Sequence, residues 1–219
     1  MKKAAIIHTS FVSVEILKEL FAEIMPDVSL MNIVDDSLLA EVIANGSITP
    51  GIVRRICGYA LEAERQNADI ILNQCSSVGE AVDIARTMIK IPYVKIDKPM
   101  GEKAVSMGKK IGVIATVSST VGPSCRLLEQ TAVEMGKEVD VKPYLVDGAL
   151  DVLMKEGNRK KHNKLVLDAI KKAENECDVI LLAQGSMIVL LPELSDIKKP
   201  LFTSPRLGVE NVKKVLSGE

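Results

Sequence analysis

The sequence contains no tryptophan, and phenylalanine and tyrosine occur only three times each. Few aromatic rings are therefore present to stack on nucleobases or on a large flat cofactor. Lysine and arginine number 28 against 29 aspartates and glutamates, so no excess of positive charge marks a surface that binds nucleic acid. No apolar run approaches the length of a membrane span. These absences predict a protein that binds neither nucleic acid nor a membrane.

Cysteine and histidine are also scarce. The four cysteines form no Cys-x-x-Cys motif, and the two histidines lie far apart, which favours neither a zinc site nor a disulfide framework. Motifs for nucleotide phosphates, G-x-G-x-x-G and G-x-x-x-x-G-K-[ST], are missing as well. The apolar run after the first lysines is too short for a signal peptide. We therefore expect a cytoplasmic protein without a metal or a cofactor.

Short apolar runs alternate with segments of helical periodicity, a pattern that predicts parallel sheets with right-handed crossovers. The predicted fold is α/β, with two similar lobes that are each a parallel sheet flanked by helices. We expect a pseudo-twofold axis to relate the lobes and the active-site cleft to lie between them. The predicted N-terminal lobe comprises residues 1–98 plus 206–219 and contains Cys75, and the C-terminal lobe comprises residues 99–205 and contains Gln184.

An internal repeat supports the two lobes. The predicted strand at 4–8 ends before Thr9, and the predicted strand at 111–115 ends before Thr116. A second match aligns residues 68–75 with 177–184, so that Cys75 and Gln184 each follow an aspartate by six positions. The two matches have nearly equal offsets, 107 and 109 residues, which indicates a duplication. Because ligands of open α/β sheets bind beyond the carboxyl ends of strands, the polar residues at these strand ends are the candidate site.

The polar segment 73–79 is the most informative of these strand ends. We expect a helix to begin near Ser77, so that unpaired backbone N–H groups and the positive end of the helix dipole lower the pKa of the Cys75 thiol. The same N–H groups, with the hydroxyls of Ser76 and Ser77, suit a carboxylate or a developing enolate oxygen. The alternative interpretation is a buried free cysteine that packs as a small apolar side chain.

The segment 116–120 is rich in hydroxyls and lies between a predicted strand and a helix expected to begin at Pro123. It is either a capping loop or a set of further donors to a small anion, and its duplicated position favours ligand contact. Among the other cysteines, Cys57 and Cys177 are expected in the core, and Cys125, near the same helix start, is expected to pack as well. His8, at the end of a central strand, suits a structural or a catalytic role equally. His162 stands among charged residues and is expected on a solvated helix face.

Three segments of the sequence resemble the aspartate/glutamate/hydantoin racemase superfamily: residues 73–79, 182–187 and 115–120. The resemblance implies cofactor-independent chemistry at a carbon next to a carboxylate, carried out in typical members by one cysteine on each lobe. Cys75 matches the first cysteine, but the second falls on Gln184, whose amide neither accepts nor donates protons usefully near neutral pH. The acidic group after the first strand of glutamate racemases falls at Thr9, and the histidine after their second cysteine falls at Ser186.

A single cysteine predicts proton transfer from one side of the substrate, as in single-cysteine relatives that are decarboxylases. The first hypothesis is an isomerase- or racemase-like enzyme on a small carboxylate or amino-acid derivative, with Cys75 as the acid/base or nucleophile. The second is a carbon–carbon lyase that uses the same residues, and the third is a binding protein without catalysis. A homodimer is a candidate assembly. The expected substrate-binding residues are Thr9, Ser10, Ser76, Ser77, Thr116, Ser118, Ser119, Gln184, Gly185 and Ser186.

Overall fold

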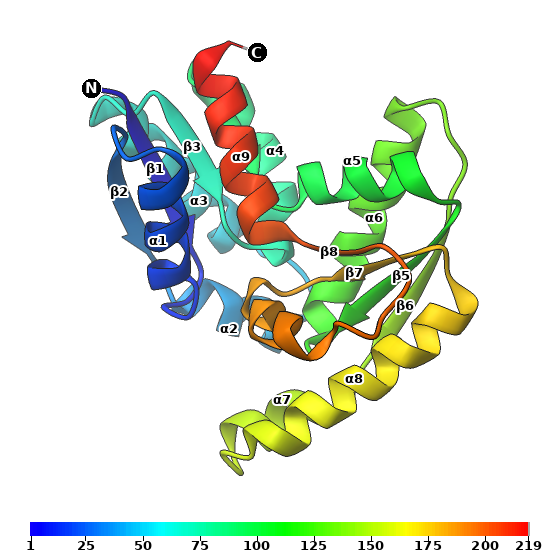
Figure 1. The fold of residues 1–219 in the computed structure, drawn as a ribbon. Coiled ribbons are helices and arrows are strands. Elements are labelled where there is room, and N and C mark those ends of the chain that lie inside the picture. Colours follow the sequence, from blue (N-terminus) through cyan, green and yellow to red (C-terminus); the bar gives the residue numbers. More distant parts are fainter. Residues whose placement is uncertain (219) are drawn as a thin grey trace. The chain divides into compact units, whose positions relative to one another are not determined.

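The computed structural model describes residues 1–218, apart from the side chain at position 154. The chain divides into two compact units (Figure 1). The first consists of Met1–Pro99 and the chain from Pro205 onward, and the second consists of Met100–Ser204. Each unit contains a four-stranded sheet in which all the strands are parallel, as the alternation of strands and helices predicts.

The sheet of the first unit has the strand order β2-β1-β3-β4. Its central strands are apolar over almost their whole length because helices cover both faces. The strands are β1 (Lys3–His8), β2 (Ser29–Val34), β3 (Ile70–Asn73) and β4 (Tyr93–Lys95). The helices are α1 (Val14–Ile24), α2 (Ser37–Asn45), α3 (Pro50–Arg65), α4 (Gly79–Ala85) and α9 (Ser204–Ser217), with 3₁₀ turns η1 (Ser76–Val78) and η2 (Arg86–Met88).

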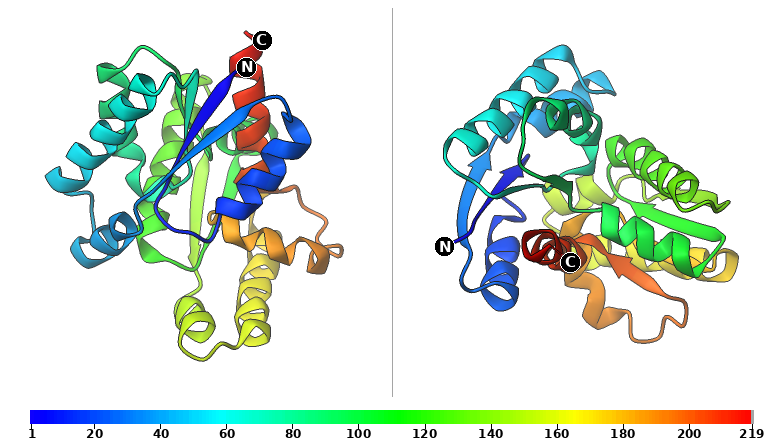
Figure 2. Two further views of the ribbon diagram at one scale, coloured as in Figure 1. Left: turned by 90° about the vertical axis from the view of Figure 1, so that its left-hand side faces the viewer. Right: turned by 90° about the horizontal axis from the view of Figure 1, so that it is seen from above.

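Alternate residues of the central strands point to opposite faces and build two cores. Ala5, Ile7 and Ile71 pack in a buried cluster with residues of α2, α3 and α4. Ile6 and Leu72 pack with residues of α1 and α9 on the other face. Figures 1 and 2 show α1 and α9 side by side on one face of this sheet, with α3 and α4 on the opposite face. The C-terminal helix therefore completes the core of the N-terminal unit.

Helix boundaries in the first unit follow the capping residues of the sequence. The hydroxyl of Thr49 accepts a hydrogen bond of 3.2 Å from the backbone N–H of Ile52, and Pro50 occupies the first turn of α3. Gly46 follows α2 with a φ of 69°, a left-handed conformation that ends a helix readily when the residue is glycine. Both boundaries are therefore set by local residue types, a capping threonine before a proline at the start of α3 and a glycine after the end of α2.

The sheet of the second unit has the equivalent order β6-β5-β7-β8. Residues of α8 and η3 form a buried cluster on one face of this sheet, and α6 contacts β5 and β6 (Figure 2). The strands are β5 (Lys110–Ala115), β6 (Asp140–Leu145), β7 (Val179–Leu182) and β8 (Leu201–Thr203). The helices are α5 (Lys98–Met107), α6 (Ser118–Glu134), α7 (Ala149–Met154) and α8 (Arg159–Glu176), with a long 3₁₀ segment η3 (Gly185–Glu193).

Two expectations for the second unit are wrong. The helix expected at Pro123 begins five residues earlier, at Ser118, so that part of the hydroxyl-rich segment lies in the first turn of α6 and Pro123 lies inside the helix. Cys125 is therefore well inside α6 rather than near its start. His162 is also buried, with 7% exposure, although its charged neighbours in the sequence indicate a solvated helix face.

The duplication extends to individual hydrogen bonds. The Asp69 carboxylate accepts from the backbone N–H of Lys3 at 2.8 Å, and the Asp178 carboxylate accepts from that of Lys110 at 2.8 Å. At the other end, the N–H of Gln74 donates to the carbonyl of Ile7, and the N–H of Ala183 donates to that of Ile114. The residues that follow, Cys75 and Gln184, therefore occupy equivalent places in the two units.

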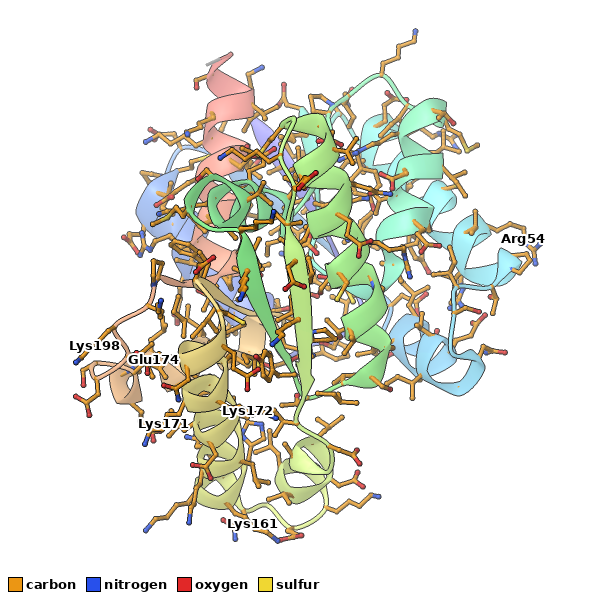
Figure 3. All side chains as sticks on the ribbon, turned by 90° about the vertical axis from the view of Figure 1, so that its right-hand side faces the viewer. Arg54, Lys161, Lys171, Lys172, Glu174 and Lys198 are labelled. Atoms are coloured by element: carbon orange, nitrogen blue, oxygen red, sulfur yellow. The ribbon has the colours of Figure 1, made fainter. Side chains whose placement is uncertain are left out.

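The outer surface of α8 is strongly charged. Figure 3 shows Lys161 and Lys171 projecting from α8, and both side chains are exposed. Glu174 of the same helix accepts a hydrogen bond of 2.6 Å from the backbone N–H of Lys198.

Among residues 1–218, no helix combines the length and the apolar character needed to cross a bilayer.

Candidate active site

Cys75 lies two residues beyond the carboxyl end of β3, which is one of the two central strands of its sheet. Its backbone is extended, with φ −123° and ψ 120°, and the 3₁₀ turn η1 begins at the next residue. The side-chain amide of Asn73 donates a hydrogen bond of 2.7 Å to the Cys75 carbonyl. Because Asn73 is itself buried on β3, this bond fixes the backbone that presents the thiol.

The Cys75 side chain is half-buried among hydroxyl groups. It forms hydrogen bonds with the side chain of Thr9 and with both the backbone N–H and the side chain of Ser77. Thr9 has 2% exposure and Ser77 has 4%, so both partners are held inside the protein. The structure therefore brings together three residues that the sequence assigns to the site from two different strand ends, and Ser10 follows Thr9 in a half-buried position.

The expected lowering of the Cys75 pKa is wrong. Burial raises the pKa of the thiol above its ordinary value, and the nearby Asp97 carboxyl raises it further, whereas the hydrogen bonds from Thr9 and Ser77 only partly oppose this. The chain directly after Cys75 is the 3₁₀ turn η1, and regular α-helix begins only at Gly79. Cys75 consequently rests as a neutral thiol, which is the form that can donate a proton.

Asp97 is a site residue that the sequence analysis missed. It lies two residues beyond β4, has only 5% exposure, and forms a hydrogen bond with the Ser76 side chain. Burial raises the pKa of its carboxyl group, while Ser76 and the charge of Lys95 lower it. The signal was present in the sequence, because an acid directly after a predicted parallel strand lies at the edge where ligands bind.

Gln184 occupies the place of Cys75 in the second unit. Its backbone is also extended, with φ −108° and ψ 132°, and the 3₁₀ segment η3 begins at the next residue. The side-chain Oε1 accepts a hydrogen bond of 3.1 Å from the backbone N–H of Thr116. The Nε2 atom is buried and has no hydrogen-bond partner among the described residues, so it can donate to a ligand.

The remaining candidates of the second unit begin two helical segments. Ser118 and Ser119 are the first residues of α6, and Gly185 and Ser186 are the first residues of η3. Ser118 and Ser186 are exposed, and the other two are half-buried. The first backbone N–H groups of a helix lack partners within the helix, so the start of α6 can hold an anion.

His8 takes a structural position at the carboxyl end of β1. The imidazole is fully buried, and its Nε2 donates a hydrogen bond of 2.9 Å to Oδ1 of Asn32 on β2. Burial lowers the pKa of His8, and the bond to Asn32 opposes this in part. Its Nδ1 atom is buried without a partner among the described residues. The ring is therefore neutral at pH 7. Of its two nitrogens, Nε2 has a hydrogen-bond partner on the neighbouring strand.

The other cysteines pack. Cys57 has 7% exposure and Cys177 has 3%, which confirms that they belong to the core. Cys125 is half-buried in α6, and burial together with the charge of Glu129 raises the pKa of its thiol. Across the described chain, no group of three or more histidines, cysteines and acids is arranged to hold a metal ion.

A second cluster of charged groups surrounds Arg55 of α3. Its guanidinium binds the carboxylate of Asp35 at 3.0 Å and also binds that of Glu41. The Tyr59 hydroxyl donates to the same Asp35 carboxylate at 2.8 Å, and these bonds, with those from Ser37, hold the pKa of Asp35 below its usual range. The shared guanidinium of Arg55 therefore joins α3 to α2 and to the segment that follows β2.

Comparison with known proteins gives a consistent result. The family described as Asp/Glu/Hydantoin racemase matches residues 8–212. Among solved structures, the aspartate racemase of Picrophilus torridus has a TM-score of 0.74 at 17% identity, with 99% of this chain and 95% of that chain covered. The allantoin racemase of Klebsiella pneumoniae has a TM-score of 0.71 at 16% identity, with 99% and 88% covered. These structures show the same fold, and no curated protein sequence matches the chain.

Proposed function

Because the chain belongs to the Asp/Glu/Hydantoin racemase family, we propose that it is a cofactor-independent, racemase- or isomerase-like enzyme that acts at the carbon next to a carboxylate. The substrate is a small amino acid or dicarboxylate, and Cys75 is the acid/base group. A glutamate racemase from Francisella tularensis with the same fold has been solved in complex with D-glutamate, which supports a substrate of this size.

The observation that carries this proposal is the surroundings of the Cys75 sulfur. A thiol beyond a strand end receives hydrogen bonds from Thr9 and Ser77, and these donors can also stabilise negative charge on a bound substrate. A carbanion beside a carboxylate is costly in water, so fixed donors in a site that excludes water must supply much of its stabilisation. In its thiolate form Cys75 removes the proton from this carbon, and the C–H electron pair stays on the substrate as an enolate. The new S–H bond then breaks as the proton returns to the carbon.

The neutral state of Cys75 favours a second candidate, a decarboxylase. In that reaction the carbon–carbon bond to the leaving carboxylate breaks, carbon dioxide departs, and the electron pair remains on the substrate as an enediolate. The Cys75 S–H bond then breaks as its proton forms a new C–H bond, and the thiolate regains a proton from water. A thiol whose pKa is raised is already in the protonated form that this step requires.

In the second unit we assign substrate binding to the start of α6 and to the Gln184 amide. The Nε2 group of Gln184 would donate to a substrate oxygen, since the bond from Thr116 to Oε1 holds the amide in one orientation. Cytoplasmic location and a homodimer stay predictions from the sequence.

Proton exchange tests the proposal directly. The protein is incubated in D₂O with a panel of amino acids and dicarboxylic acids, and each compound is followed by proton NMR. We expect deuterium to enter the position next to the carboxylate of at least one compound. Loss of carbon dioxide would instead identify the decarboxylase, and ligand-induced stabilisation without turnover would identify a binding protein and refute both enzymatic candidates.

Two variants make the test specific to the site. Cys75→Ala should abolish turnover of the identified substrate, whereas Cys125→Ala, which removes another half-buried thiol, should leave turnover within about twofold because no catalytic role is assigned to it. Gln184→Glu keeps an acceptor for Thr116 but replaces the Nε2 donor with a charge that repels a carboxylate, so the apparent KM should rise by about tenfold or more. Normal turnover by Cys75→Ala would disprove the catalytic assignment.

A further inference from the structure

Asp97 is a buried acid that has no role in the proton transfer proposed above. Its side chain has 5% exposure, and an ionised carboxylate is rarely buried to this extent without a compensating partner. The Asp97 carboxyl group accepts hydrogen bonds from the side chain of Ser76, the residue next to Cys75, and from its own backbone N–H. These neutral donors compensate a buried charge only in part, since burial still raises the pKa of the carboxyl group, so the cost of burying this acid requires a further explanation.

The backbone around Asp97 is held firmly against the strand that presents Cys75. The N–H of Ile96 donates a hydrogen bond of 3.0 Å to the carbonyl of Asn73 on β3. On the other side, Gly208 of α9 approaches so closely that a Cβ there would lie 2.9 Å from the carbonyl oxygen of Ile96. Asn73 in turn donates to the Cys75 carbonyl, so Asp97 and Cys75 are tied to the same short segment of β3.

The charged groups around this pair are few among the described residues. Lys95 on β4 lowers the pKa of Asp97, but its ammonium is already bound to the Asp83 carboxylate of α4 at 2.7 Å, and Asp83 itself raises the pKa of Asp97. On α9, Arg206 is bound to Glu23 at 2.7 Å. Lys98, the first residue of α5, is the next cation along the chain.

We propose that Asp97 is a positioning residue for Cys75, whose buried carboxyl group holds the Ser76 hydroxyl and places negative charge near the sulfur. The charge of Asp97 acts on the buried Cys75 sulfur, and two interacting negative charges in a buried site are unfavourable, so the thiol–carboxyl pair retains at least one proton through the neutral pH range. Under the proposed function, this makes the sulfur regain its proton after each transfer. Asp97 therefore sets Cys75 to act from the thiol state.

The test measures the thiol directly and needs no substrate. The full-length protein is alkylated with iodoacetamide at a series of pH values, and the rate at Cys75 is read from its peptide by mass spectrometry, with Cys125 as the internal reference. Asp97→Asn preserves shape and hydrogen bonding but removes the charge. We expect the midpoint of the Cys75 profile to move down by about one pH unit, which is tenfold more thiolate, and the rate at pH 7 to rise about threefold after the loss of nucleophilicity.

Two further variants separate charge from structure. Asp97→Glu keeps the negative charge and should keep the high midpoint. Asp69→Asn removes an acid at the opposite end of the sheet, beside Lys3, and should leave the Cys75 midpoint unchanged. Thermal melts show whether each variant is folded. If Asp97→Asn does not fold, the Cys75 midpoints of Asp97→Glu and of the parent protein are compared at several salt concentrations instead.

An unchanged Cys75 midpoint in folded Asp97→Asn would overturn the inference, and so would an equal shift in Asp69→Asn. For Asp97→Glu, a midpoint that falls as far as in Asp97→Asn would also refute the role of charge. These results leave the proposed function standing, because Cys75 could still transfer protons. Conversely, if Cys75→Ala retained turnover, the proposed function would fail while the measured link between Asp97 and the thiol could persist.

Discussion

The substitution Gly208→Ala should destabilise the protein even though alanine is the better helix former. Gly208 lies in the interior of α9, where Gly→Ala normally stabilises a helix by about 1 kcal/mol. Here the added Cβ would lie 2.5 Å from the Ile96 Cγ1 atom, 2.9 Å from its carbonyl oxygen and 3.1 Å from its Cα. The Cγ1 atom can rotate away, but the two backbone atoms cannot move without shifting β4.

The size of the effect follows from these two opposing contributions. Overpacking of a buried position costs about 1–3 kcal/mol, and helix propensity returns about 1 kcal/mol, so we expect a net loss of about 1–2 kcal/mol. The displaced segment leads directly to Asp97, so the Cys75 profile and turnover should change together with stability. A stability change alone would mean that the shift is absorbed within α9.

Urea unfolding followed by circular dichroism measures the free energy, with Gly58→Ala as the matched control. Gly58 lies inside α3, where a Cβ would meet no atom within 4 Å, so this variant should be stabilised by about 0.5–1 kcal/mol. The two substitutions are chemically identical and should differ in sign. A Gly208→Ala protein as stable as Gly58→Ala would refute the close packing of α9 against β4.

Two further predictions concern buried polar groups of the first unit. Arg55→Ala should lower the free energy of unfolding by about 1–3 kcal/mol because it leaves the Asp35 and Glu41 carboxylates without their shared cation. Arg54→Ala, at an exposed neighbour in α3 (Figure 3), should change it by less than about 0.5 kcal/mol. Urea unfolding at pH 7 measures both variants, and equal effects would contradict a stabilising role for the cluster. The lowered pKa of His8 means that the unfolded chain binds a proton more readily than the folded protein, so the contribution of His8 to stability is present above about pH 6.5 and is lost as the pH falls below it. His8→Gln should remove that part of the slope between pH 7.5 and 5.5, and parallel curves for the two proteins would show that His8 does not titrate on unfolding.

The sequence predicts the framework well because buried parallel strands carry a strong local signal. The strands around Ile6 and Ile71 are continuous apolar runs, and the cap at Thr49–Pro50 fixes the start of α3. The match between Asp69 and Asp178 predicts the duplication, and the two carboxylates make the same backbone contact in both units. The apolar runs and the cap depend on residues close together in the chain, and the duplication is visible because the two aspartates precede similar strands.

The errors come from burial, which depends on segments distant in the chain. The polar neighbours of Cys75 indicate an activated thiolate, but burial outweighs its hydrogen bonds and raises its pKa. The predicted start of α6 at Pro123 is too late because proline favours a first-turn position, although a helix can continue through proline where packing and local adjustments tolerate it. Asp97 directly follows a predicted strand, but its burial and its contact with Ser76 are visible only in the structure.

The difference between Cys75 and Gln184 is best explained as a division of roles within a repeated framework. Each side chain follows an equivalent strand and contacts the threonine that follows β1 or β5: the hydroxyl of Thr9 bonds to the thiol, and the N–H of Thr116 bonds to the amide oxygen. If Gln184 were a remnant of a lost cysteine, nothing would require its amide to be held in one orientation. The bond from Thr116 fixes Oε1 and leaves Nε2 as a buried donor without a protein partner, which costs stability unless a ligand uses it. This arrangement agrees with the proposed function, in which the thiol transfers protons from one side of the substrate and the amide binds it.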